Sequence, residues 1–212
     1  MIEYVIAHNP DDRILKKASE LLSQGQLVCF PTDTNWILAA CSTQKDAIEK
    51  LYKIKKENTQ KHFSILCNDI SMASDMALID NQAFKLLKKI IPGHYTFIFE
   101  ATKKMSKLIK ASKTDKEVGI RFVPSILVEK IIQTHGLPLV STNIPKSLLG
   151  IDEENNEPIY SYQLEDKINQ YTSLIIDPGE IDFKGPSSII SFIGENPPTI
   201  IRDGSGSTEL FS

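Results

Sequence analysis

The chain has few of the residues that build disulfide frameworks or zinc sites. Its three cysteines lie far apart in apolar segments, and its four histidines lack the spacing of metal ligands. Cysteines placed in this way are typical of reduced core residues in a cytosolic protein. Neither a disulfide set nor a protein-bound structural metal is therefore expected. The residues concerned are Cys29, Cys41, Cys67, His8, His62, His94 and His135.

Long apolar runs and the common nucleotide-binding loops are also lacking. No stretch approaches the roughly 20 apolar residues that span a bilayer, and no charged-then-apolar leader opens the sequence. The sequence contains no Walker-type loop, no Gly-x-Gly-x-x-Gly loop and no nucleophile elbow. We therefore expect a cytoplasmic protein without membrane contact. If it is an enzyme, we expect it to work by binding and positioning its reactants, without covalent attack.

What is present is ordinary for a soluble globular protein. The 212 residues are 41% hydrophobic and 24% charged, enough for one large domain with its own core. The net charge of −3 argues against non-specific nucleic-acid binding by the whole surface. Lysines gather at 50–61 and 103–116, and acidic residues at 152–157. Such runs indicate either a solvated face or a local binding face.

Apolar periodicity and turn residues predict alternating helices and strands. This order predicts a single α/β domain over residues 1–212, with a twisted, partly parallel open sheet and helices packed on it. The polar, acidic region at 145–158 predicts a mobile loop, and residues 204–212 a frayed tail. Helices are expected at about 12–24, 43–55, 81–91, 125–135 and 162–171, and strands at 27–30, 36–41, 63–67, 95–99, 118–122, 137–141, 174–176, 188–192 and 199–202.

The segment after the first central strand is the most informative one. The apolar run 27–30 stops at Pro31, which cannot donate to a sheet ladder, and Thr32, Asp33 and Thr34 follow at once. Two hydroxyls and a carboxylate at a strand end are typical of a binding position on an α/β scaffold. The same residues also favour a turn that satisfies its own backbone.

Basic side chains occur at two further positions of interest. Lys53 and Lys55 end a predicted helix, where they favour the helix dipole or bind an anion. Arg121 is the only basic residue in the apolar strand at 118–122. Its guanidinium requires a partner, which is either a carboxylate or phosphate ligand bound through two bonds or an acidic residue of the protein.

Small polar side chains occupy a third position. Ser141, Thr142 and Asn143 follow an apolar run, where a strand is expected to open into a loop. Their hydroxyl and amide groups are good ligands for phosphate or ribose, and equally good turn formers. Arg202, at the end of the last predicted strand, is another candidate cation.

Seven short motifs occur in the order and spacing of one protein family. On these motifs the chain resembles the YrdC/YciO family, over about residues 9–206, and segments 80–84 and 92–98 look closest to its YciO branch. The motifs are Pro31-Thr32-Asp33-Thr34, Lys53-Ile54-Lys55, Pro92-Gly93-His94-Tyr95-Thr96, Val118-Gly119-Ile120-Arg121, Leu139-Val140-Ser141-Thr142-Asn143, Gly185-Pro186-Ser187-Ser188 and Ile201-Arg202-Asp203-Gly204.

The resemblance implies a YrdC-like α/β fold of the DHBP-synthase type, a twisted open mixed sheet with flanking helices around a large basic cavity. The best-characterised members are L-threonylcarbamoyladenylate synthases, which are nucleotidyltransferases. They join L-threonine, bicarbonate and ATP, with Mg²⁺, and release pyrophosphate. Their product serves the t6A modification of adenosine 37 in tRNA. Further partners implied by the family are tRNA or double-stranded RNA and other t6A-modification proteins.

The resemblance also implies roles for individual residues. Those that would contact threonine are Thr32, Thr34, His62, Arg121, Ser187 and Ser188. Those that would contact the nucleotide and its phosphates are Lys53, Lys55, Ser141, Asn143 and Arg202. Lys53, Lys55 and Arg121 would be catalytic, because cations neutralise the charge that develops on a leaving pyrophosphate.

Three positions differ from the family pattern. Lys55 stands where the family has arginine, Trp36-Ile37 stands where it has tyrosine and glycine, and Glu117 replaces a threonine. These differences favour an alternative, an RNA- or tRNA-binding protein of the same fold with weak or no synthase activity. A third alternative is another carbamoyl-type acyl transfer, as in hydrogenase-maturation proteins. The lack of acylphosphatase or zinc-finger segments argues against it.

Overall fold

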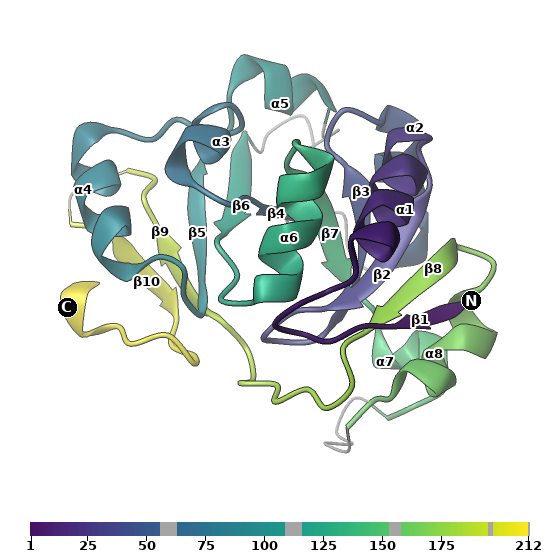
Figure 1. The fold of residues 1–212 in the computed structure, drawn as a ribbon. Helices are drawn as coiled ribbons and strands as arrows, with labels where there is room; N and C mark the ends of the chain where they lie inside the picture. The colour runs from purple at the N-terminus through teal and green to yellow at the C-terminus, as the bar shows by residue number, and fades with distance from the viewer. Residues whose placement is uncertain (56–62, 109–115, 153–157, 195–196, 212) are drawn as a thin grey trace.

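In the described part of the chain, ten strands form one sheet, which Figure 1 shows running across the molecule. The computed structural model describes residues 1–55, 63–108, 116–152, 158–194 and 197–211. The strand order is β1-β8-β2-β3-β7-β4-β6-β5-β9-β10. Neighbours are parallel at β1–β8, β2–β8, β4–β6 and β5–β9, and antiparallel at the other pairs. The expected mixed α/β sheet is therefore confirmed.

The strands are short and mostly buried. β2 and β3 have no exposed residue, as expected for central strands covered on both faces. Their bounds are β1 (Ile2–Tyr4), β2 (Leu27–Pro31), β3 (Trp36–Cys41), β4 (Ser64–Leu66), β5 (Tyr95–Glu100), β6 (Glu117–Arg121), β7 (Leu139–Asn143), β8 (Thr172–Asp177), β9 (Ser188–Ser191) and β10 (Thr199–Arg202).

Most of the longer helices begin at a side-chain cap. Asp11, Asp80 and Ser125 each accept a hydrogen bond from a backbone N–H of the first turn. The helices are α1 (Asp12–Ser23), α2 (Lys45–Lys55), α3 (Ile70–Ser74), α4 (Asn81–Ile90), α5 (Lys103–Leu108), α6 (Ile126–His135), α7 (Lys146–Leu149) and α8 (Ser161–Ile168), with a short 3₁₀ turn, η1, at Glu209–Phe211. No described helix is long and apolar enough to cross a bilayer.

Two apolar clusters lie on the two faces of the sheet. On one face, α1 and α6 pack side by side on the sheet (Figure 1), and Leu22, Ile131 and Phe30 belong to the apolar cluster there. On the other face, α2 and α8 contribute Leu51 and Ile168 to the larger cluster. Side chains of β2 alternate between these clusters, which fixes the register of the strand.

The tail expected to fray is packed on the core at its end. Phe211 is buried beside the ring of Tyr95, at 6.2 Å between ring centres. Gly206 allows this approach, because a Cβ atom there would lie 2.5 Å from the Tyr95 ring. A close fit between glycine backbone and an aromatic ring is not visible in the periodicity of the sequence.

Two other expectations on local structure differ from what the structure shows. β7 extends to Asn143, so the polar triplet that begins at Ser141 belongs to the strand and not to a loop after it. The predicted loop at 145–158 contains α7, and residues 153–157 lie outside the described part of the chain. The mobility of this region, and the assignment of the whole chain to one domain, stay predictions.

Candidate functional site

Hydrogen bonds of the Thr32 backbone and hydroxyl stabilise the polar turn between β2 and β3. The Thr32 backbone N–H donates to the carbonyl of Asn35 at 2.9 Å, and Thr32 Oγ1 accepts from the backbone N–H of Thr34 at 3.2 Å. The two threonine hydroxyls are 3.1 Å apart. Thr32 therefore supports the turn, while the side chains of Asp33 and Thr34 extend from it.

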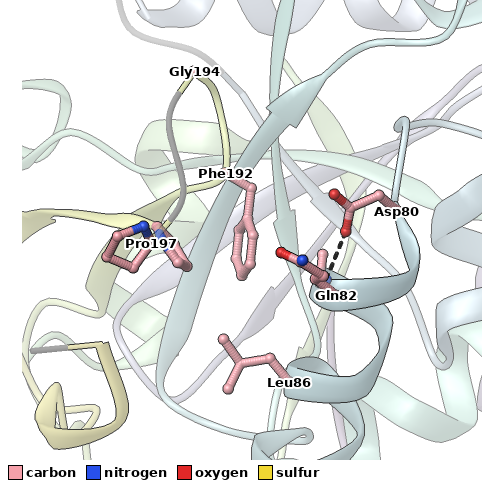
Figure 2. Close-up of a pocket in the computed structure, with 8 residues that line it drawn as sticks. Asp80, Gln82, Leu86, Phe192, Gly194 and Pro197 are labelled. Atoms are coloured by element: carbon pink, nitrogen blue, oxygen red, sulfur yellow. Dashed lines mark hydrogen bonds between the residues drawn. The ribbon is translucent and has the colours of Figure 1, made fainter.

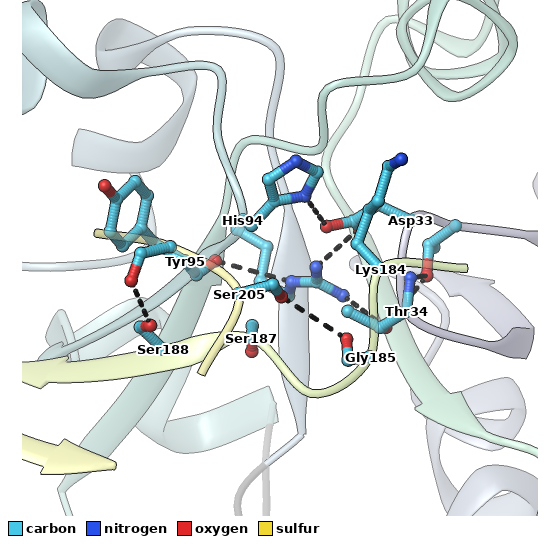
Figure 3. Close-up of polar contacts among 12 residues, drawn as sticks. Asp33, Thr34, His94, Tyr95, Lys184, Gly185, Ser187, Ser188 and Ser205 are labelled. Carbon is cyan, nitrogen blue, oxygen red and sulfur yellow. Dashed lines mark hydrogen bonds and ion pairs between the residues drawn. The ribbon is translucent and has the colours of Figure 1, made fainter. Parts of the chain in front are cut away.

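Arg121, at the end of β6, reaches across to this turn, whose Asp33 and Thr34 are labelled in Figure 3. Its Nη2 donates to Asp33 Oδ1 at 2.6 Å, and its Nη1 donates to Thr34 Oγ1 at 3.1 Å. Its Nε lies 3.4 Å from the carbonyl oxygen of Tyr95, at the start of β5. Three segments that are far apart in the sequence are thus joined by one guanidinium.

This ion pair is buried. The side chains of Arg121 and Asp33 are 6% and 5% exposed. Burial lowers the pKa of Arg121, the charge and hydrogen bond of Asp33 raise it, and the charge of Arg202 lowers it further. The guanidinium stays protonated because its intrinsic pKa is so high. Asp33 thus supplies the acidic partner that the sequence left open, while binding of a ligand by Arg121 stays a prediction.

His94 completes this group, although no role was expected for it. Its Nδ1 lies 2.8 Å from Asp33 Oδ2, so the carboxylate has one partner on each oxygen. His94 sits in the resemblance motif between Gly93 and Tyr95, and Asp33 sits between the two threonines. These motif positions were the only hint in the sequence that the two residues matter. They lie 61 residues apart, and the fold of the sheet brings them into contact. No pattern along the sequence predicts it.

Ser188 begins β9 and Ser187 directly precedes it, and the two serines have different surroundings. The Ser187 hydroxyl lies 2.8 Å from Thr96 Oγ1, and its carbonyl accepts from Arg202 Nη2 at 2.7 Å. Ser188 Oγ donates to the carbonyl of Gly206 at 2.6 Å and accepts from the Gly204 N–H at 2.9 Å. Ser188 therefore anchors the tail, and Ser187 is the serine that lies beside other candidate residues.

Arg202 binds Ser187, but three other residues expected to contact the nucleotide are held separately. Ser141 Oγ donates to the carbonyl of Ser64 in the neighbouring strand, at 3.1 Å. Lys53 and Asn143 are exposed on α2 and at the end of β7. Among the described residues, no hydrogen bond or ion pair joins these three to the Arg121 group. Lys55 ends α2, and His62 lies outside the described residues.

The bulk of Trp36-Ile37 is directed into the core. Trp36 is 1% exposed and belongs to the larger apolar cluster, whereas Ile37 is 2% exposed and belongs to the other. The indole Nε1 of Trp36 donates to the carbonyl of Ile159 at 2.7 Å. These side chains therefore fill opposite faces of the sheet, as alternation along β3 requires.

A cavity of about 220 Å³ lies elsewhere, between α4 and the turn that joins β9 and β10 (Figure 2). Its wall includes Asp80, Gln82, Leu86, Phe192 and Pro197. It contains none of the candidate residues. The large basic cavity implied by the resemblance therefore stays a prediction.

Curated relatives share nearly the whole length of this chain. An uncharacterised protein of Haemophilus influenzae is 30% identical over 208 residues, which cover 98% of this chain and 97% of the relative. A threonylcarbamoyl-AMP synthase of Vibrio vulnificus is 26% identical over 132 residues, which cover 61% of this chain and 70% of that enzyme.

Solved structures show the same fold. The crystal structure of E. coli YciO matches with a TM-score of 0.85 and 26% identity, and covers 100% of this chain and 99% of that one. P. abyssi Sua5, solved in complex with L-threonine, matches with a TM-score of 0.80 and 22% identity, over 96% of this chain and 57% of that one.

The family model for Sua5, YciO and YrdC proteins, described as telomere recombination, matches residues 20–204. This span includes the β2–β3 turn, Arg121 and Ser187. The chain therefore belongs to the Sua5/YciO/YrdC family, which is related to the threonylcarbamoyl-AMP synthases.

Proposed function

We propose that this protein is an L-threonylcarbamoyladenylate synthase, a nucleotidyltransferase that makes threonylcarbamoyl-AMP from L-threonine, bicarbonate and ATP for t6A modification of tRNA. The observation that carries the proposal is the group of Asp33, Thr34 and Arg121, in which the carboxylate and the guanidinium are buried. A carboxylate, a hydroxyl and a guanidinium side by side match the ammonium and carboxylate of a free amino acid. Family membership supports the same substrate, because a related Sua5 was solved with L-threonine.

The proposed reaction requires a carbon dioxide unit on the amino nitrogen and then an adenylyl group on the new carbamate. Both steps join reactants held side by side, so binding and orientation supply most of the catalysis. Arg121 orients the Thr34 hydroxyl and provides positive charge at the amino-acid end. Lys53, Lys55, Ser141, Asn143 and Arg202 would hold the nucleotide and its phosphates, and Ser187 and Thr32 would line the threonine end. Lys53, Lys55 and Arg121 would be catalytic.

Mg²⁺ enters this proposal with the nucleotide. Among the described residues, no group of three or more His, Cys, Asp or Glu side chains is placed to hold a metal ion. When bound to the triphosphate, the ion neutralises charge on the departing pyrophosphate. The residues of the chain then have to place the phosphates, and the lysines at the end of α2 are the candidates.

Pyrophosphate release tests the proposal directly. The purified protein is incubated with ATP, Mg²⁺ and bicarbonate, with and without L-threonine. We expect release that depends on threonine and bicarbonate, and that is far weaker with L-alanine, which lacks the hydroxyl. Release that is independent of threonine, or no release at threonine concentrations that saturate binding, would refute the synthase.

The second candidate function is binding of tRNA or double-stranded RNA without synthase activity. The replacement of a phosphate-binding arginine by Lys55 favours it, because an ammonium cannot hold two oxygens as a planar guanidinium does. Tight, salt-sensitive RNA binding together with absent pyrophosphate release would support this function. The core positions of Trp36 and Ile37 remove one argument for it, because their bulk is directed into the core.

A further inference from the structure

Asp33 divides its carboxylate between two partners. Oδ1 accepts from Arg121 Nη2 at 2.6 Å, and Oδ2 lies 2.8 Å from His94 Nδ1 (Figure 3). The Asp33 side chain is 5% exposed, and that of His94 is 32% exposed. Since the carboxylate is almost out of water, each oxygen needs a donor from the protein. His94 is the donor for the second oxygen.

The segment before His94 holds the imidazole in place. The Gly93 N–H donates to the carbonyl of Phe122 at 2.9 Å, next to the end of β6. A Cβ atom on Gly93 would lie 2.7 Å from the Ile90 carbonyl oxygen and 2.8 Å from the Tyr95 ring. Only glycine fits this turn. His94 is therefore tied to the same strand end that carries Arg121.

The orientation of the Asp33 carboxylate affects the Thr34 hydroxyl through Arg121, which donates to both. Arg121 donates to Asp33 through Nη2 and to Thr34 through Nη1, so a rotation of Asp33 would turn the guanidinium away from Thr34. The backbone of Asp33 is fixed separately, because its carbonyl accepts from the Lys184 N–H at 2.8 Å. The side-chain angle of Asp33 is thus what His94 controls.

We propose that His94 is a positioning residue of the amino-acid site: it holds Asp33 so that Arg121 and Thr34 present a fixed fork and hydroxyl to the substrate. The inference rests on the proposed function for the identity of that substrate. It assigns His94 no direct contact with threonine and no proton transfer. His94 acts through Asp33.

Two substitutions of His94 distinguish the effect of its hydrogen-bond donor from the effect of its ring. In His94→Asn the side-chain amide can still donate to Asp33, whereas His94→Leu removes the donor at similar size. We expect His94→Leu to raise the KM for threonine roughly tenfold, since a buried acceptor loses its partner, with kcat within about threefold. We expect His94→Asn to stay within about threefold of the wild type in both constants. His8→Leu, at an exposed histidine outside this group, is the control and should change neither.

The result that would overturn the proposal is an unchanged threonine KM in His94→Leu. A fall in kcat that His94→Asn fails to rescue would also overturn it, because that pattern marks a group that touches the reacting atoms. A rise in the KM for ATP equal to that for threonine would overturn it too, since it marks a general loss of structure.

A test without turnover separates this inference from the proposed function. Urea midpoints are measured for His94→Leu, Asp33→Asn and the double variant. If His94 acts by holding Asp33, the double variant is no less stable than Asp33→Asn alone. Additive losses overturn the inference even if the synthase is confirmed. If the stability losses are not additive but the protein has no synthase activity, the result supports the role of His94 in holding Asp33. It then refutes only the proposed reaction.

Discussion

The two ends of the proposed site are built differently. The amino-acid end is a closed network in which Asp33, Thr34 and Arg121 bind one another, with His94 behind them. Of the described side chains at the nucleotide end, those of Ser141 and Arg202 bind backbone carbonyls, and Lys53 and Asn143 are exposed. Arg202, for example, is exposed and donates to the neutral carbonyl of Ser187.

This difference shows which side chains of the proposed site are already ordered before a substrate binds. A buried ion pair with a hydrogen-bonding partner on each carboxylate oxygen has one favourable geometry, so its orientation costs nothing further on binding. Exposed lysines lose side-chain freedom only when a phosphate binds. The amino-acid end is therefore the preorganised half, and ligand binding has to order the nucleotide half.

The largest effect should come from removing the buried carboxylate. Asp33→Ala leaves Arg121 charged and without its partner, and we expect it to lower the free energy of unfolding by about 3–5 kcal/mol. Arg202→Ala removes an exposed side chain from a neutral carbonyl and should cost about 1 kcal/mol or less. Urea denaturation measures both. Equal losses would show that the two halves do not differ in rigidity.

The next effect concerns what Arg121 does for the substrate. Arg121→Lys keeps the charge but loses the planar fork, so threonine binding should weaken by about 1.5–3 kcal/mol while ATP binding is retained. Calorimetric titration of each ligand separately gives the two affinities. If both fall together, or neither changes, Arg121 belongs to the structure of the protein and holds no carboxylate.

A smaller gain is expected at the nucleotide half. Lys55→Arg restores the residue of the family pattern, and an added charge-assisted bond at the end of α2 should strengthen ATP binding by about 1 kcal/mol. The measurement is calorimetry with a non-hydrolysable ATP analogue. Lys50→Arg, earlier on the same helix, is the matched control and should have no effect. A gain in the control alone, or none at Lys55, would mean that no phosphate binds there.

The smallest expected effect is a shift in the pKa of Cys41, a thiol that lies outside both halves of the proposed site and serves as a reference for them. Burial raises the pKa of the Cys41 thiol, but its interactions with His135 and Thr43 outweigh the effect of burial, so the pKa lies below its usual value. Burial instead raises the pKa of Cys67. Because the folded pKa of Cys41 is depressed, its thiolate stabilises the fold above the unfolded pKa, and this stability is lost as pH falls through the folded pKa.

Absorbance of the thiolate against pH measures these shifts. His135→Phe should move the Cys41 transition to higher pH and leave that of Cys67 unchanged, because His135 lowers the pKa of Cys41 alone. Cys41→Ser identifies which transition belongs to Cys41. An unmoved Cys41 transition in His135→Phe would show that the Thr43 hydroxyl acts alone.

Sequence patterns predicted most of the fold because the central elements have strong local signals. The strand at Trp36–Cys41 was predicted with its observed bounds, and Asp80 and Ser125 were expected helix starts. β1 was missed, because its three residues owe their strand structure to pairing with β8 at the far end of the chain. Short helices such as α3 and α5 have too few turns to show periodicity.

The site was predicted only in part, because local sequence signals identify single residues but not the contacts between distant ones. Thr34 and Arg121 were selected on residue type, and the structure brings them together. Asp33 and His94 were not assigned roles, because their importance depends on a contact that only the folded sheet creates. Ser188 was grouped with Ser187, although the Ser187 hydroxyl lies beside Thr96 and the Ser188 hydroxyl binds the backbone of Gly204 and Gly206.

The buried indole of Trp36 gives this protein a built-in optical reporter. It is the sole tryptophan of the chain, it lies two residues after Thr34, and its ring is shielded from water. Fluorescence excited at the indole band therefore originates from one known place. Unfolding will bring that ring into water and move its emission to longer wavelength. Any ligand that tightens the β2–β3 turn will alter the same signal without an attached label.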